Sequence, residues 1–260
     1  MTVPSLSFTA PAGPAGAPLV VLGPSLGTST ILWEKVVPLL AERYRVVAWD
    51  LPGHGASAPA AAPFTVADLA DAVAEAVRAQ GDERVLYAGI SLGGAVGLEL
   101  ALRHPSLVAA AAIVCSGATV GTPAGWQERA AQVRAQSTST LIIGSAQRWF
   151  APGSIEREPE ITGRLLHALQ DAHDESYALC CEALAAYDVT ARLGEIEAPL
   201  LAAWGEHDGV TPEASSVEVA SGVRQGRVEM IPDASHLPAA EQPAALGALL
   251  LDFFGSVAGR

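Results

Sequence analysis

The stretch VLYAGISLGGAVGLEL, residues 85–100, changes its pattern halfway along its length. Residues 85–90 form a continuous apolar run of strand length, and the residues after Ser91 have a helical pattern. Gly89 and Gly93 flank Ser91, so the chain can turn sharply and pack closely at this boundary. A Gly-x-Ser-x-Gly pattern is weak evidence alone, but its strand-turn-helix setting predicts a reactive serine whose hydroxyl projects from the sheet.

Other apolar runs of strand length lie on both sides of this stretch. They are continuous rather than alternating, which is typical of parallel strands buried on both faces. Residues 227–231 alternate instead and are predicted to lie nearer a sheet edge. Helical patterns separate the runs, so the order β-α-β-α predicts an α/β fold with a mostly parallel, doubly wound sheet. The predicted buried strands are residues 18–23, 44–49, 84–89, 107–115 and 199–204.

The alternation of strands and helices stops after about Gly117 and resumes at Pro199. We therefore expect residues 1–116 and 190–260 to form the core, with residues 117–189 inserted as a helical lid. Such a lid would cover the carboxyl ends of the strands, where open α/β sheets bind ligands. The aromatic side chains of this segment either face a ligand or form the lid's own core: Trp126, Trp149, Phe150 and Tyr187.

Charge and composition exclude several classes of function. The formal net charge is −13 and Lys35 is the only lysine, which argues against a nucleic-acid surface. Residues 1–33 are uncharged, but prolines interrupt them and no apolar run is long enough to span a membrane. The expectation is a cytoplasmic protein without membrane or nucleic-acid partners. Neither a metal site nor a disulfide framework is expected from the three cysteines, Cys115, Cys180 and Cys181.

A serine nucleophile needs a base and an acid that orients the base. His236 follows the last predicted strand, in VEMIPDASHLP, which is the late position that the base of such a fold occupies. Asp208 lies four residues after the strand that ends at Trp204, and its loop should face His236. We favour Asp208 as the acid, with Glu206 and Asp233 as alternatives.

Two loops are expected to support this site. The backbone N–H of Leu92, at the start of the helix, and that of Leu26, in PSLGTSTILW, are the candidate donors to an oxyanion. The stretch WDLPGHGAS, residues 49–57, contains Asp50 and His54, which could be mistaken for a catalytic pair. Its prolines and glycines favour a rigid loop near the site instead.

With these residues assembled, the chain resembles the α/β-hydrolases, and among them the 3-oxoadipate enol-lactonases of the β-ketoadipate pathway of aromatic degradation. The resemblance covers essentially the whole chain. Pro24 is a departure, because these lactonases commonly carry asparagine there. The motifs that carry the resemblance are SLGTSTILW, WDLPGHGAS, GISLGG, GTPAGWQERAAQVR, RWFAPG, CCEALAAYDV, GEHDGVTP and ASHLPAAEQP.

The resemblance implies a cofactor-free enzyme that opens 3-oxoadipate enol-lactone to 3-oxoadipate through an acyl-enzyme on Ser91. Ser25 and Trp126 are then expected to contact this anionic lactone. Arg129 lies three residues after Trp126, on the same helix face, and is the candidate partner of the substrate carboxylate. Arg134 and Arg148 are rivals, and each of the three arginines could instead be a solvated surface residue.

Three other functions remain open at this point. The same three residues could serve an esterase or a carbon-carbon bond hydrolase that acts on ring-cleavage products. A ligand-binding relative without turnover is a third possibility, because fold does not fix function. The sequence does not determine the oligomeric state.

Overall fold

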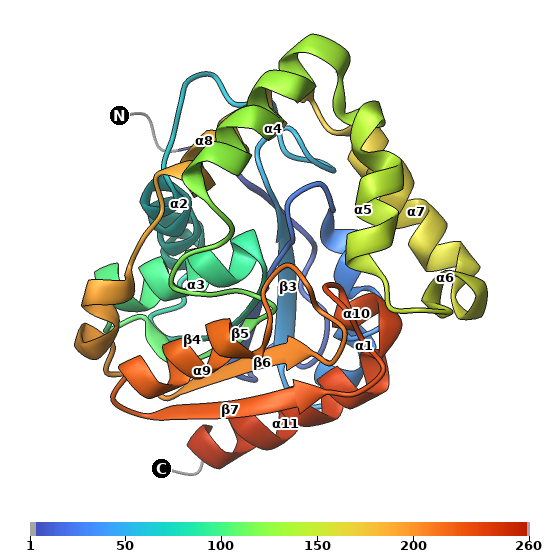
Figure 1. Ribbon diagram of the computed structural model, residues 1–260. Helices are drawn as coiled ribbons and strands as arrows, with labels where there is room; N and C mark the ends of the chain where they lie inside the picture. Colours follow the sequence, from blue (N-terminus) through green and yellow to red (C-terminus); the bar gives the residue numbers. More distant parts are fainter. Residues whose placement is uncertain (1–3, 259–260) are drawn as a thin grey trace.

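The apolar runs form one seven-stranded sheet in the computed structural model, which describes residues 4–258 (Figure 1). The strand order is β1-β3-β2-β4-β5-β6-β7, and every pairing is parallel except that of β1 with β3. The strands are β1 (Ser7–Phe8), β2 (Leu19–Gly23), β3 (Arg45–Asp50), β4 (Val85–Ile90), β5 (Val108–Val114), β6 (Leu200–Gly205) and β7 (Gly226–Ile231).

The predicted fold class is confirmed. Each of the five predicted buried strands appears within a residue or so of its expected bounds, and β2 and β4 are buried along their entire length. β7 forms the edge of the sheet, as its alternating pattern predicted, and most of its residues are exposed. The two-residue strand β1 was not predicted, because it is too short to show a hydrophobic period.

The register of the sheet places three loops at one edge. Gly23, at the end of β2, lies opposite Gly89, near the end of β4. On the other side of β4, Ile90 pairs with Val114, the last residue of β5. Because the carboxyl ends of parallel strands meet at one edge, the loops that follow β2, β4 and β5 lie together.

Helices pack against the faces of the sheet. Helix α3 packs against β2, β4 and β5, α9 against β6 and β7, and α11 against β5 and α1. The helices of the core are α1 (Val37–Leu40), α2 (Val66–Ala79), α3 (Leu92–Arg103), α9 (Glu213–Gly222), α10 (Pro238–Glu241) and α11 (Pro243–Ala258), with 3-10 turns η1 (Thr30–Trp33) and η3 (Thr190–Glu195).

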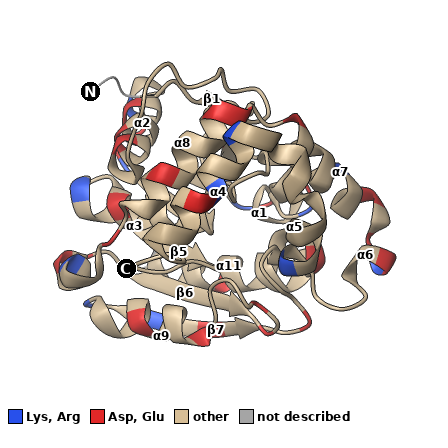
Figure 2. Ribbon diagram, turned by 45° about the horizontal axis from the view of Figure 1, so that its top comes forward, with Lys and Arg blue, Asp and Glu red and all other residues tan. Residues whose placement is uncertain are grey.

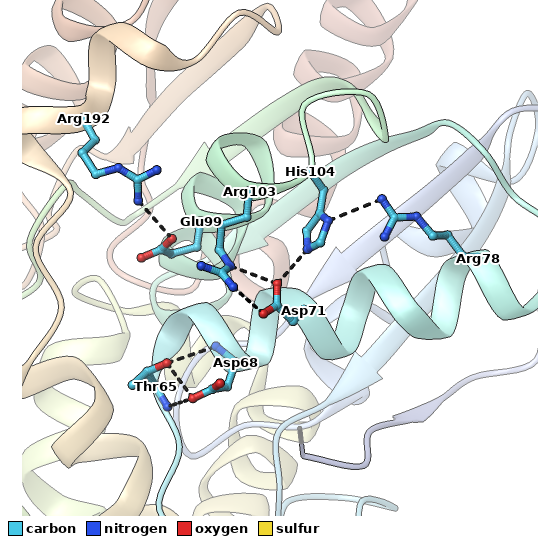
Figure 3. Close-up of polar contacts among 8 residues, drawn as sticks. All are labelled: Thr65, Asp68, Asp71, Arg78, Glu99, Arg103, His104 and Arg192. Carbon is cyan, nitrogen blue, oxygen red and sulfur yellow. Dashed lines mark hydrogen bonds and ion pairs between the residues drawn. The ribbon is translucent and has the colours of Figure 1, made fainter. Parts of the chain in front are cut away.

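Helix α2 shows how local sequence signals and packing agree. Thr65 caps it, accepting a hydrogen bond from the Asp68 backbone while the Asp68 carboxylate accepts one from the Thr65 backbone. Its apolar face is buried against α3, where Asp71 accepts a hydrogen bond from Arg103 at 2.9 Å and lies 2.8 Å from a ring nitrogen of His104 (Figure 3). These contacts fix α3, the helix that follows Ser91, against its neighbour.

A group of helices lies between β5 and β6 in the sequence, in the segment from residue 117 to residue 189, here called the insertion. In Figure 1 its green and yellow helices α4 to α7 gather on one side of the molecule, away from α9 and α11. Helices α4 and α8 pack extensively against each other. The ends of the expected core, residues 1–3 and 259–260, lie outside the described residues. The insertion contains α4 (Pro123–Gln136), η2 (Thr138–Leu141), α5 (Ile142–Trp149), α6 (Ser154–Arg157), α7 (Pro159–Asp171) and α8 (Asp174–Ala185).

Charged residues occupy mainly the helices and loops around the sheet (Figure 2). The central strands carry almost none, in keeping with their burial on both faces. Within residues 4–258, none of the helices is both long enough and apolar enough to cross a membrane.

Candidate active site

Ser91 occupies a strained turn between β4 and α3. Its backbone angles, φ 55° and ψ −116°, lie in a region that residues with side chains rarely adopt. The Ser91 amide donates to the Val114 carbonyl at 3.0 Å, and the Ser116 hydroxyl donates to the Ser91 carbonyl at 2.7 Å. The end of β5 and the loop after it therefore hold both backbone polar groups of Ser91, which is how a protein can maintain such a conformation.

The two glycines of the motif are required by close packing. A Cβ atom on Gly89 would lie 2.2 Å from the Gly93 carbonyl oxygen, and one on Gly93 would lie 2.6 Å from the Pro24 carbonyl oxygen. The Gly93 amide donates to that same Pro24 oxygen at 2.9 Å. Pro24 thus joins the loop after β2 to the start of α3 through its carbonyl group, which every residue type could supply.

Asp208 and His236 meet in the loops that follow β6 and β7. His236 Nδ1 lies 3.0 Å from Asp208 Oδ2, and both residues are at least 95% buried. Thr211 supports the carboxylate, donating its hydroxyl to Oδ2 at 2.8 Å and its amide to Oδ1 at 3.2 Å. The Val210 amide also donates to Oδ1 at 2.8 Å. The carboxylate is therefore fully hydrogen-bonded and fixed in orientation.

The electrostatics of Asp208 favour its ionised form. Burial alone would raise its pKa, but the charge and hydrogen bond of His236, with the hydrogen bonds from Thr211 and Val210, outweigh burial and hold the pKa below its usual value. An ionised carboxylate on Nδ1 leaves Nε2 as the nitrogen that can accept a proton. The two alternative acids are elsewhere: Glu206 and Asp233 are exposed, and Glu206 accepts the Asp233 amide at 3.0 Å.

The backbone amides around the two candidate oxyanion donors are already used. Gly27 N–H points to His54 Nε2 at 3.3 Å, and Thr28 N–H donates to the Ser25 carbonyl at 3.1 Å. Leu92 is the first residue of α3, where an amide has no acceptor within its helix. Among the hydrogen bonds found within residues 4–258, none uses the amide of Leu26 or of Leu92 as donor. These two amides can therefore serve an oxyanion.

The loop of residues 49–57 supports the site through hydrogen bonds rather than by lining the cavity. Asp50 accepts the amides of Thr30 at 2.7 Å and Ala56 at 2.9 Å, and His54 Nδ1 lies 2.9 Å from the Pro52 carbonyl oxygen. Burial lowers the pKa of His54 to about 4, so its ring is neutral near pH 7. The geometry favours the rigid-loop interpretation, because the neutral ring accepts the Gly27 amide and orders the oxyanion loop.

A cavity of about 230 Å³ joins the core residues to the insertion. From the core it is lined by the buried residues Ser91 and His236, together with Ser25 and Leu26. The residues that line it include no aspartate or glutamate among those described. From the insertion it is lined by Gly121, Thr122, Gly125, Trp126, Arg129, Arg148, Trp149 and Tyr177, and from the loop after β6 by Gly209 and Val210.

Two of the three candidate arginines face this cavity. The Arg129 guanidinium lies over the Trp126 ring, 5.0 Å from its centroid, and the Trp126 indole N–H donates to the Val120 carbonyl. Arg148 is exposed, yet partial desolvation lowers its pKa and the charge of Arg129 lowers it further. Within the described residues, neither guanidinium forms an ion pair with a carboxylate. Arg134 is paired with Glu175 and Glu182 and does not line the cavity, so the structure removes it as a rival.

Cys115 lies beside Asp208 and His236, and the ligand atoms of these three residues are all within 4.8 Å of one another. Burial raises the pKa of the Cys115 thiol well above its usual value, so the metal-binding thiolate form is disfavoured. The Asp208 carboxylate is already occupied by His236, Thr211 and Val210. The arrangement therefore suits a hydrogen-bonded histidine better than a metal ion.

Thr211 and Tyr177 are among the residues of the site that were not predicted. Thr211 holds Asp208, and its signal in the sequence is a hydroxyl three residues after the acid, in DGVT. Tyr177 lines the cavity from α8, and its ring stacks on His54 with centroids 6.0 Å apart. No local signal marks Tyr177, because its contact with the cavity depends on how α8 packs against the core.

Comparisons with known proteins agree with this geometry. The family model of the alpha/beta hydrolase fold matches residues 18–243. The chain is 34% identical to 3-oxoadipate enol-lactonase 2 of Acinetobacter baylyi over 233 residues, 90% of this chain and 87% of the relative. It is 31% identical to a pimeloyl-acyl-carrier-protein methyl ester esterase of Neisseria meningitidis, over 89% of this chain and 91% of the relative.

A solved structure is similar to this chain over nearly its whole length. The crystal structure of the enol-lactonase from Burkholderia xenovorans LB400 superimposes with a TM-score of 0.93, at 30% identity, and covers 96% of each chain. The resemblance to 3-oxoadipate enol-lactonases that the motifs indicated is thus confirmed by independent comparisons of sequence and structure. The chain belongs to the α/β-hydrolase fold family and is a hydrolase.

Proposed function

We propose that this hydrolase opens 3-oxoadipate enol-lactone to 3-oxoadipate through an acyl-enzyme on Ser91. One observation carries the proposal: a single small cavity contains Ser91, His236 and two guanidiniums without carboxylate partners among the described residues. A substrate with a reactive ester bond at one end and a carboxylate at the other would satisfy both ends of this cavity. The enol-lactonase relatives act on a lactone of that kind by name.

In the proposed first step, His236 takes the proton of the Ser91 hydroxyl as its oxygen attacks the lactone carbonyl carbon. The amides of Leu26 and Leu92 stabilise the negative charge that develops on the carbonyl oxygen. The ring C–O bond then breaks, and its electron pair leaves on the enol oxygen. His236 returns the proton to this leaving group, and the enol rearranges to the ketone.

The second step releases the product. Water gives a proton to His236 and its oxygen attacks the acyl carbon, forming a second tetrahedral intermediate. The Ser91–acyl bond breaks as His236 returns the proton to the Ser91 oxygen, and the released acid loses its proton to solvent to give the second carboxylate of 3-oxoadipate. Asp208 orients His236 and stabilises its imidazolium in both steps, and the chemistry requires no cofactor.

We propose that the insertion acts as a lid that selects the substrate. Arg129 and Arg148 would hold the free carboxylate, while Trp126 and Trp149 would cover the apolar part of the ring. Ser25, which lines the cavity, would contact the lactone beside the oxyanion donors. On this proposal the enzyme would act in the β-ketoadipate pathway of aromatic degradation, in the cytoplasm.

A simple esterase is the second candidate function. The relative from Neisseria meningitidis is a methyl ester esterase by name, and Trp126, Trp149 and Tyr177 give the cavity aromatic lining. On this alternative the guanidiniums would stay solvated and would not discriminate between charged and neutral substrates.

The deciding experiment compares kcat/KM for three substrates: the enol-lactone, its neutral methyl ester and a simple aryl ester. The proposal predicts that the charged lactone is preferred over its methyl ester by about 10-fold or more, the value of one charged hydrogen bond. Equal kcat/KM values for the charged and neutral lactones would refute carboxylate recognition. A higher value for the aryl ester than for both lactones would favour the esterase.

A further inference from the structure

Glu241 is a buried carboxylate that the mechanism above does not use. It ends α10, five residues after His236, and only 5% of it is exposed. A buried carboxylate is costly unless its oxygens are hydrogen-bonded. The donors that satisfy Glu241 come from two parts of the chain, and this division indicates its role.

One oxygen of Glu241 binds the insertion. Oε1 accepts the Ala151 amide at 2.6 Å and the Ser154 hydroxyl at 2.8 Å. Arg157 in turn donates to the Ser154 oxygen at 2.9 Å, so the hydroxyl proton points to the carboxylate. Both donors of this arm lie just after Arg148 and Trp149, the residues with which α5 lines the cavity.

The other oxygen binds the loop that carries the base. Oε2 accepts the amide of Ser235, the residue before His236, at 2.8 Å. The same loop also contacts the insertion directly: the Ser235 hydroxyl lies 3.2 Å from the Arg148 carbonyl, and the Leu237 amide donates to the Trp149 carbonyl at 3.2 Å. Every partner of Glu241 named here donates a hydrogen bond, and an ionised carboxylate can accept them all. Burial raises the pKa of Glu241, whereas these hydrogen bonds lower it.

We propose that Glu241 is a positioning residue that holds two segments as one unit: the base loop, residues 235–237, and the cavity wall, residues 148–154. The positions of His236, in the base loop, and of Arg148 and Trp149, in the cavity wall, therefore depend on the same carboxylate. The role of the wall in substrate binding rests on the proposed function, whereas the role of the base loop requires only that Ser91 is activated by His236.

Substitution of Glu241 by Gln disrupts the link between the two arms. Gln keeps the size of the side chain but has one acceptor oxygen, so its NH₂ group must face the N–H donor of one arm. The test measures the rate at which a fluorophosphonate labels Ser91, which reports the base, and KM for the anionic lactone, which reports the wall. Glu241→Gln should slow labelling about 10-fold and raise KM about fivefold, as loss of sub-ångström positioning does.

Two further variants complete the test. Ser154→Ala removes a donor of the wall arm only, so it should raise KM while labelling stays within about twofold of wild type. Glu34→Gln is the matched control, because Glu34 joins the core to the insertion through Arg164 at the surface and should change neither rate nor KM by more than about twofold.

The outcomes are distinct. Labelling and KM of Glu241→Gln both within about twofold of wild type would overturn the proposal, since displaced groups normally cost more. If that variant does not fold, Ser154→Ala decides: an unchanged KM overturns the proposal and an increase supports it. If the wild-type chain labels but opens no lactone, the proposed function has failed, and the labelling rates still decide the role of Glu241.

Discussion

The core and the insertion contribute to the same cavity in different ways. The core places its groups through backbone: Ser91 is held by strand hydrogen bonds, and the carboxylate of Asp208 is held by amides of its own loop. The insertion contributes long side chains on helices, such as Arg129 on α4 and Arg148 on α5. The difference suggests that the core determines the reaction and the insertion determines the substrate.

The largest difference in activity between variants of the two regions should come from substitution of the acid, Asp208. Asp208→Asn removes the negative charge opposite His236 and favours the wrong tautomer of the ring, so kcat should fall by about 10⁴-fold on every substrate. Steady-state kinetics on the charged lactone and on an aryl ester would measure this.

Glu206→Gln is the matched control for the acid, because Glu206 is the neighbouring, exposed carboxylate. Its kcat should stay within about twofold of wild type, as for most surface substitutions. A loss in Glu206→Gln equal to that in Asp208→Asn would contradict the assignment of the acid.

A change in the insertion should affect one substrate more than another. Arg129→Ala removes a guanidinium from the cavity and should raise KM for the charged lactone by about 10- to 100-fold, with little effect on a neutral ester. Arg134→Ala, on the same helix but paired with Glu175 and Glu182, should leave KM nearly unchanged. Equal losses on charged and neutral substrates would show that Arg129 supports the fold rather than the carboxylate.

The two regions also differ in how far the sequence predicts them. The core was predictable because buried parallel strands are continuous apolar runs, and Ser91 and Asp208 each follow such a run. His236 follows the alternating edge strand β7, which was also visible in the sequence. The roles of the side chains in the insertion were not predictable in this way. Arg129 and Arg134 lie on one helix, and only ion pairs with residues 41 and 48 positions away in the chain show that Arg134 is bound to carboxylates. Glu241 was missed for the same reason, since all its long-range partners come from the insertion.

Substitution of glycine by alanine should also affect the stability of the two regions differently. Gly93→Ala puts a Cβ 2.6 Å from backbone atoms of Gly23 and Pro24, and should lower the free energy of unfolding by about 1–3 kcal/mol. Gly163→Ala, within α7 of the insertion, meets no atom within 4 Å and should raise it by up to about 1 kcal/mol. Urea denaturation would measure both, and a stable Gly93→Ala protein would contradict the close packing at the turn.

The smallest effect concerns pH. Because the folded-state pKa of His54 is about 4, below its unfolded value of 6.5, the unfolded chain takes up the proton first as pH falls. The stability contributed by neutral His54 is present above pH 6.5 and is lost toward pH 4, by about 1 kcal/mol between pH 7 and pH 5.5. His54→Gln should lack this part of the slope in urea denaturation at the two pH values; an unchanged slope would contradict the buried, neutral ring.

The central claim is that Ser91, held in its strained turn, is the nucleophile for the lactone. The most direct test is kcat/KM of Ser91→Ala for 3-oxoadipate enol-lactone, with the melting temperature measured on the same preparation. The claim predicts a loss of at least about 10⁴-fold in a protein that melts no lower than wild type. A folded Ser91→Ala protein that keeps kcat/KM within about 10-fold of wild type would contradict it.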